Sequence, residues 1–219
     1  MTAAQAAAPA RKRRSTATDL ALIASFAALI GACSFLPAIP IGVVPITLQT
    51  FAVILAGAVL GSTRGALAVL LWMAVGIVGL PVFTAGGAGL APFAGPSVGY
   101  LVSFPIAAFF TGFVVERLPR KRIATSIPLI LIAGAAASIL ITYPLGALGM
   151  AWRADLTLGQ AFVFGLSFIP GDLLKNVLMS IVATSVHRAF PALLPARGRA
   201  ATAPSAPAQP ASAPAAPTA

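Results

Sequence analysis

Two ionisable residues, Asp172 and Lys175, stand within a long apolar stretch and are the clearest candidates for chemistry in this sequence. Their spacing of three places both side chains on one face of a helix. A carboxylate accepts hydrogen bonds and an ammonium donates them, so the pair could bind a ligand that carries both kinds of polar group. Asn176 adds an amide beside them. The pair could instead merely cap its own helix, but ionisable groups in a membrane segment are costly and indicate a functional site.

Other polar residues fall at the same level of the expected helices. They are Thr47, Gln49 and Thr50 after Pro45, Thr84 and Ser97 in a glycine-rich segment, and Tyr100 just beyond it. A threonine in a helix commonly bonds its own backbone, whereas the amide of Gln49 has no easy local partner. With Phe83, Phe93 and Trp152 nearby, the set indicates a pocket that has apolar walls and few polar groups.

The sequence offers no catalytic or metal-binding cluster. Cys33 is the single cysteine and His187 the single histidine, so a cysteine-based metal site within one chain is excluded. His187 has no second histidine or nearby acid and is expected at the membrane interface. We therefore expect no catalytic residues, no metal and no cofactor.

Composition excludes a soluble globular protein. Hydrophobic residues make up 59% of the 219 residues and charged residues 8%, against roughly a quarter charged in soluble domains. The apolar residues come in blocks of about 20, the length that a helix needs to cross a hydrocarbon core. We expect an all-α, polytopic protein in the cell membrane, surrounded by lipid.

The distribution of basic residues sets the expected orientation. The net charge of +10 could suggest nucleic-acid binding, but 12 of the 14 Lys and Arg residues fall on one side of the expected membrane spans. Arg153 alone falls on the other side, and Lys175 lies in a span. Because basic residues are retained in the cytoplasm, we expect both termini inside and no nucleic-acid partner.

Six spans are expected, and their outer loops border the expected pocket. They cover about residues 19–36, 44–61, 65–80, 98–115, 124–143 and 170–190. Pro45 is expected in the first turn of the second span, where proline costs no hydrogen bond, and Pro144 is expected to stop the fifth. Residues 158–190 are too long for one span, so Pro170-Gly171 should separate a short outer or re-entrant helix, 158–168, from the sixth span.

The domain organisation follows from these spans. Residues 1–17 form a basic tail and residues 191–219 a tail rich in alanine and proline, and both are expected to be disordered because neither can form a core. The membrane domain covers 18–190. In its first span Ala24, Ala28 and Ala32 form a stripe of small residues, which serves either internal packing or the docking of a partner helix.

Three separated motifs resemble one family. They are Val44-Pro45-Ile46-Thr47-Leu48-Gln49-Thr50-Phe51, the run from Gly79-Leu80-Pro81-Val82-Phe83 to Gly95-Pro96-Ser97-Val98-Gly99-Tyr100, and Phe168-Ile169-Pro170-Gly171-Asp172-Leu173-Leu174-Lys175. In this order they resemble the BioY family, the biotin-specific substrate-binding (S) components of energy-coupling factor (ECF) transporters. The similarity covers about residues 18–190.

The resemblance implies a six-helix fold in the cell membrane of a prokaryote, with outer loops that cap a ligand pocket. Biotin would bind there near the outer face, with Asp172 and Lys175 matching the family's Asp and Lys. It also implies a transmembrane coupling protein and two ABC-type ATPases as partners, with Ala24, Ala28 and Ala32 facing the coupling protein. The chain has no phosphate-binding loop of its own. Two other functions stay open, a solitary transporter, with or without proton coupling, and an S component for another vitamin. A membrane-embedded enzyme lacks its expected cluster.

Overall fold

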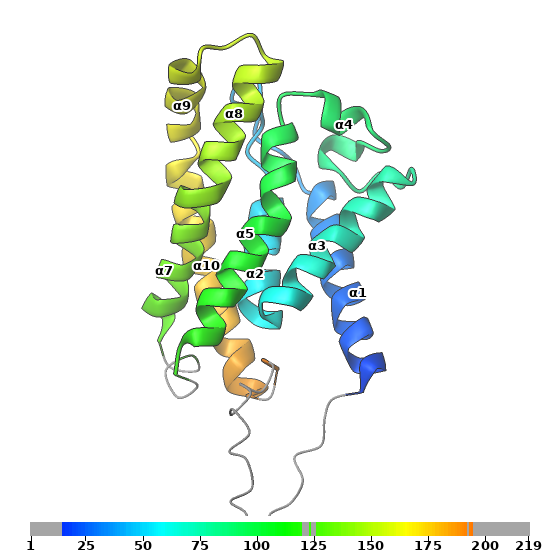
Figure 1. Cartoon of the computed structure of the whole chain (residues 1–219), viewed down its shortest axis with the longest axis vertical. Coiled ribbons are helices and arrows are strands. Elements are labelled where there is room, and N and C mark those ends of the chain that lie inside the picture. The colour runs from blue at the N-terminus through cyan, green and yellow to red at the C-terminus, as the bar shows by residue number, and fades with distance from the viewer. Residues whose placement is uncertain (1–14, 120–122, 124–125, 192, 195–219) are drawn as a thin grey trace, which may run out of the picture.

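The computed structural model describes residues 15–119, 123, 126–191 and 193–194. Within these ranges the regular structure is helical, apart from two isolated β-bridges. Figure 1 shows the longer helices running along the long axis of the molecule, with the start of α1 and the end of α10 at the same end.

Helix α1 spans Thr16–Ala32 and continues as a 3₁₀ turn, Cys33–Phe35. Its N-terminus is capped by Ser15, whose hydroxyl accepts the N–H of Thr18, a common way to satisfy the first free amide groups of a helix. The helix thus begins inside the segment expected as an N-terminal tail. Residues 1–14 and 195–219 of the two expected tails lie outside the described residues.

The prediction that Pro45 lies in the first turn of a helix is wrong. Helix α2 spans Gln49–Leu60, and Ile39 and Ile46 form an antiparallel pair through two backbone hydrogen bonds of 2.9 Å. Proline disfavours helical geometry in the residue before it, and the bridge holds this segment extended. The residues before Gln49 therefore form a non-helical segment instead of the first turn of α2.

Helix α3, Ser62–Ile77, follows α2 after a sharp break at Gly61, which has a φ of 89°. All residues of α2 except Thr50 and Phe51 are buried, so this short helix lies in the centre of the bundle. Gly57 allows the close packing, because a Cβ at this position would collide with the backbone carbonyl of Ala108. Ser62, the first residue of α3, donates its N–H and hydroxyl to Glu116 at 2.8 and 2.9 Å.

A loop with a 3₁₀ turn, Thr84–Gly86, and a short helix α4, Ala91–Ala94, connects α3 to α5, Val98–Arg117. Helix α5 matches the expected fourth span, 98–115. It packs against α2 and α3 on one side and α8 on the other. Its first turns and the N-terminus of α2 line the same pocket, through Tyr100 and Leu101 and through Gln49 and Thr50.

The prediction that Pro144 ends the fifth span is also wrong. Helix α7, Ile127–Ala137, passes through one turn of π-helix, Ser138–Thr142, into α8, Tyr143–Arg153. In this wider turn the N–H of Tyr143 bonds the carbonyl of Ser138, which shifts the hydrogen-bond register just before the proline that has no N–H to donate. The chain therefore stays helical over 27 residues, from Ile127 to Arg153.

The expected break near Pro170 is confirmed. Helix α9 spans Leu158–Leu166 and α10 spans Ile169–Ala189, and the two are bent by 52°. Thr157 and Gln160 form a reciprocal capping box at the start of α9. Pro170 occupies the first turn of α10, where the missing N–H costs nothing.

Three helices in the described ranges are long and apolar enough to cross a membrane, and the bent α9–α10 pair makes a fourth if it counts as one span. The three are residues Thr16–Phe35, Val98–Arg117 and Ile127–Arg153. Helices α2 and α3, at 12 and 16 residues, are apolar but shorter. The all-α fold with several candidate membrane spans is thus observed, while the number of crossings is taken up below as a proposal.

Candidate functional site

The first turns of α10 hold the charged residues of the site. Asp172 lies in the first turn, where the positive end of the helix dipole favours a carboxylate. Lys175 follows one turn later, and its Nζ lies 2.8 Å from the Oδ1 atom of Asp172. The two side chains are 11% and 12% exposed respectively, so this ion pair is largely removed from solvent.

Two further side chains from other helices complete the network. The hydroxyl of Tyr143 in α8 donates to the Oδ2 atom of Asp172 at 3.1 Å. Lys175 also donates to the hydroxyl of Thr50 in α2, at 3.2 Å. An ammonium has three N–H donors and a carboxylate about four acceptor positions, so both groups keep capacity for a ligand after these contacts.

A pocket opens beside this network and includes Asp172 and Lys175 in its lining. Its polar lining residues are Thr47, Gln49, Thr50, Thr84, Ser97, Tyr100, Asp172 and Lys175, and its apolar ones are Val44, Pro45, Ile46, Leu101, Phe104 and Phe168. This is the composition expected for a ligand that is apolar in its body and polar at a few points.

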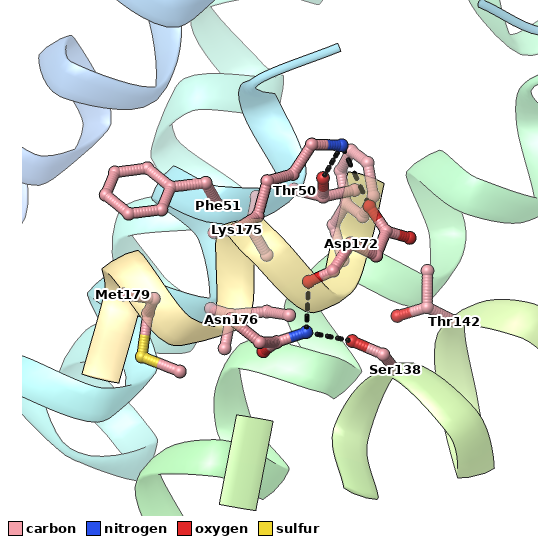
Figure 2. Close-up of a pocket in the computed structure, with 11 residues that line it drawn as sticks. Thr50, Phe51, Ser138, Thr142, Asp172, Lys175, Asn176 and Met179 are labelled. Carbon is pink, nitrogen blue, oxygen red and sulfur yellow. Dashed lines mark hydrogen bonds and ion pairs between the residues drawn. The ribbon is translucent and has the colours of Figure 1, made fainter. Parts of the chain in front are cut away.

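A second, smaller cavity adjoins the pocket and shares Thr50, Asp172 and Lys175 with it. Figure 2 shows Asn176 pointing toward Ser138, while Lys175 points to Thr50 and Asp172. The Asn176 amide nitrogen donates to the Asp172 carbonyl at 3.0 Å and to the Ser138 hydroxyl at 3.4 Å. Its Oδ1 atom is buried and has no hydrogen-bond partner among the described residues.

Most of the residues expected at the site are thus brought together. Thr47, Gln49, Thr84 and Tyr100 line the pocket with Asp172 and Lys175, and Asn176 lines the adjoining cavity. The hydroxyl of Tyr100 is buried and has no hydrogen-bond partner within the described ranges. These residues come from the segment before α2, from α2, α5 and α10, and from the 3₁₀ turn Thr84–Gly86, which are far apart in the sequence.

The aromatic residues expected at the pocket lie elsewhere. Phe83 is 1% exposed and its ring packs edge-on against Trp72 and Phe93, with centroids 5.1 and 5.6 Å apart. Neither Phe83 nor Phe93 is among the residues that line the two cavities. Trp152 is 68% exposed, and Arg153 stacks on it at 3.9 Å.

The amide of Gln49 has no local partner, as expected, but it has two distant ones. Its Oε1 atom accepts the hydroxyl of Thr84 at 2.8 Å, and its Nε2 atom donates to the carbonyl of Val82 at 3.3 Å. Both partners belong to the loop after α3, more than 30 residues away in the sequence. Local spacing could not have revealed them.

Sequence reasoning did not identify Tyr143, nor two aromatic residues that line the pocket, Phe104 and Phe168. Tyr143 was expected at the end of a span, because Pro144 follows it. Phe104 and Phe168 are apolar residues in apolar segments, which carry no signal of their own. Among the described residues no three His, Cys, Asp or Glu side chains are grouped so as to hold a metal ion.

Comparison with known families agrees with this geometry. A sequence profile described as the BioY family matches residues 6–192, most of the chain. The chain belongs to the BioY family. The three motifs that indicated the resemblance in the sequence converge on the pocket, since each contributes lining residues.

Several BioY relatives are similar along nearly their whole length. A protein named Biotin transporter BioY from Rhodobacter capsulatus is 47% identical, over 82% of this chain and 98% of its own. The protein of the same name from Rhizobium etli is 41% identical, over 82% and 97%. One from Lactococcus lactis is 33% identical, over 79% and 90%.

A solved structure shares both the fold and part of the sequence. It is the crystal structure of an S-component for biotin from an ECF-type ABC transporter. Its TM-score to this chain is 0.74 at 30% identity, and the match covers 82% of this chain and 95% of the other. The BioY assignment therefore rests on sequence and on three-dimensional arrangement.

Proposed function

We propose that this chain is the membrane-embedded, biotin-binding S component of an ECF-type vitamin uptake transporter. It captures biotin from the outer side and passes it inward, and it is a transport protein rather than an enzyme. The observation that carries the proposal is the largely buried Asp172–Lys175 pair beside an apolar-walled pocket. It occurs in a chain of the BioY family whose solved relative is an S-component for biotin.

The chemistry of biotin matches the lining groups. Its ureido ring carries two N–H donors and one carbonyl acceptor, its bicycle and chain are apolar, and it ends in a carboxylate. Asp172 can accept a ureido N–H as a charge-assisted hydrogen bond. Lys175 can donate to the ureido carbonyl or to the carboxylate. The apolar residues Ile46, Leu101, Phe104 and Phe168 would cover the remainder.

The orientation proposed here has six crossings, with both termini in the cytoplasm. Two observations support it. The start of α1 and the end of α10 lie at the same end of the molecule (Figure 1), and 12 of the 14 basic residues fall on the expected cytoplasmic side. The short helices α2 and α3 would then cross within the bundle, where α2 is shielded from lipid by its neighbours.

Energy for uptake would come from partner proteins, since the sequence has no phosphate-binding loop. These partners are proposed to be a transmembrane coupling protein and two ABC-type ATPases. Ala24, Ala28 and Ala32 are exposed along one side of α1. Small exposed residues allow two helices to approach closely in lipid, which fits the docking of a coupling protein.

A ligand-shift experiment tests the proposal. Purified protein in detergent is heated with biotin, thiamine or riboflavin, and the midpoint of unfolding is measured. Only biotin should raise the midpoint, because a ligand stabilises the folded state that binds it. A shift with thiamine or riboflavin and none with biotin would replace the substrate assignment.

Uptake assays then separate coupled from solitary transport. In a host that lacks coupling ATPases, the chain alone should bind labelled biotin without accumulating it. Accumulation in that host that stops when an uncoupler is added would indicate a solitary, proton-coupled transporter instead.

A further inference from the structure

The side chain of Gln49 is turned toward a loop of its own chain. It is 1% exposed and stands at the first position of α2, beside the pocket. Both ends of its amide are used, since Oε1 accepts from Thr84 and Nε2 donates to the carbonyl of Val82. A buried amide whose groups are already bonded has less capacity for a ligand than its position suggests.

The base of the loop, Val82–Thr84, is fastened from two helices. The carbonyl of Val82 accepts from Gln49 in α2 and also from the indole N–H of Trp72 in α3, at 2.9 Å. Phe83 anchors the same point, because its ring is buried against Trp72 and Phe93. The base is therefore rigid where it meets the bundle.

The tip of the loop, residues 85–89, differs from the base in its backbone conformation. Ala85, Gly86 and Gly89 adopt positive φ angles of 56°, 74° and 66°. Ala85 and Gly86 are exposed, and a Cβ at Gly86 or Gly89 would meet no atom within 4 Å. The left-handed conformation strains Ala85 and suits glycine. Two backbone hydrogen bonds hold this tip, from Phe83 N–H to the Gly87 carbonyl at 3.0 Å and from Gly89 N–H to the Gly76 carbonyl of α3 at 2.8 Å.

Thr84 is the last residue of the base, next to the exposed tip, and it lines the pocket. Its hydroxyl donates to Gln49 at 2.8 Å, and this is the bond through which α2 holds the wall of the pocket. We propose that Gln49 and Thr84 form a latch, and that this latch positions the loop 84–90 at the pocket and sets how fast a ligand enters and leaves. Gln49 is thus a positioning residue.

This inference rests on the proposed function, because the ligand used to test it is biotin, but it makes a separate claim about rates. Every group of the latch belongs to this chain, so the bond stabilises the closed loop equally with and without a ligand. Weakening it raises the frequency of opening in both states. Association and dissociation should then accelerate by the same factor, and the affinity should hardly change.

The test uses Thr84→Val, which keeps the shape of the side chain and removes the hydroxyl, with Thr84→Ser as the matched control that keeps it. Association and dissociation of radiolabelled biotin are measured on purified protein. Loss of one hydrogen bond should raise both rates of the Thr84→Val variant about 3- to 10-fold and leave the dissociation constant within about twofold. The Thr84→Ser rates should match those of the wild type.

Two results would overturn the latch. Unchanged rates in Thr84→Val would show that the bond does not control opening. A faster dissociation with no faster association, and therefore a weaker affinity, would mean that Thr84 contacts the ligand itself. Gln49→Met, which fills a similar volume and makes neither bond, gives an independent check and should repeat the Thr84→Val pattern. Wild-type protein that fails to bind biotin would contradict the proposed function instead.

Discussion

The hydroxyl of Tyr143 donates a 3.1 Å hydrogen bond to the Oδ2 atom of Asp172, from α8 to α10. Lys175 holds the other carboxylate oxygen at 2.8 Å. The carboxylate is thus fixed from both sides, once by a charge and once by a neutral donor. A fixed acceptor costs a ligand less conformational entropy than a mobile one.

Replacing Tyr143 by Phe should weaken biotin binding roughly tenfold without unfolding the protein. The change removes only the hydroxyl that orients Asp172, and hydrogen bonds to charged groups are individually strong. Equilibrium binding of labelled biotin measures the effect. Ser185→Ala is a suitable control, because that exposed hydroxyl bonds only the Ile181 carbonyl of its own helix. Equal affinities for wild type and Tyr143→Phe would remove Tyr143 from the site.

Asp172→Asn and Lys175→Ala should each abolish binding of labelled biotin. Each change also leaves the other member of a largely buried ion pair without its partner, which is costly in itself. Thermal unfolding must therefore show that the variants are folded. Asp155→Asn is the control, since Asp155 is exposed with a φ of 51°, a conformation that asparagine accepts. Wild-type affinity in both site variants would refute the site.

Gly57→Ala should lower the unfolding temperature clearly, while Gly159→Ala should not. A Cβ at Gly57 collides with the backbone of Ala108 between α2 and α5, whereas a Cβ at Gly159 meets no atom within 4 Å. Overpacking of this kind typically costs about 1 to 3 kcal/mol. Thermal unfolding of both variants in detergent compares their stabilities. Equal stability would mean that α2 and α5 are not packed as closely as described.

Ala28→Trp should leave biotin binding intact and prevent co-purification with a coupling protein. Ala28 is exposed on α1, and a large ring there would keep a partner helix at a distance. Val163→Trp is the control, because Val163 is 66% exposed on α9, away from the alanine stripe. If Ala28→Trp still assembles and supports uptake, the docking surface lies elsewhere.

The apolar blocks, the break at Pro170 and the pairing of Asp172 with Lys175 could all be predicted from the sequence. Each depends on residues close together in the chain. Membrane helices need long apolar segments, proline has no N–H to donate, and residues three apart share a helix face. These constraints act within one helix, so the sequence of that helix is enough to predict their effect.

The tertiary structure decided how the helices pass their prolines and where the other polar groups point. Pro144 does not end its helix, because the π turn before it changes the hydrogen-bond register. Gln49 turns to Thr84 and Val82 rather than standing free, and Tyr143 reaches Asp172. Such partners are separated by about 30 residues and meet only after the helices have packed, so local spacing carries no record of them.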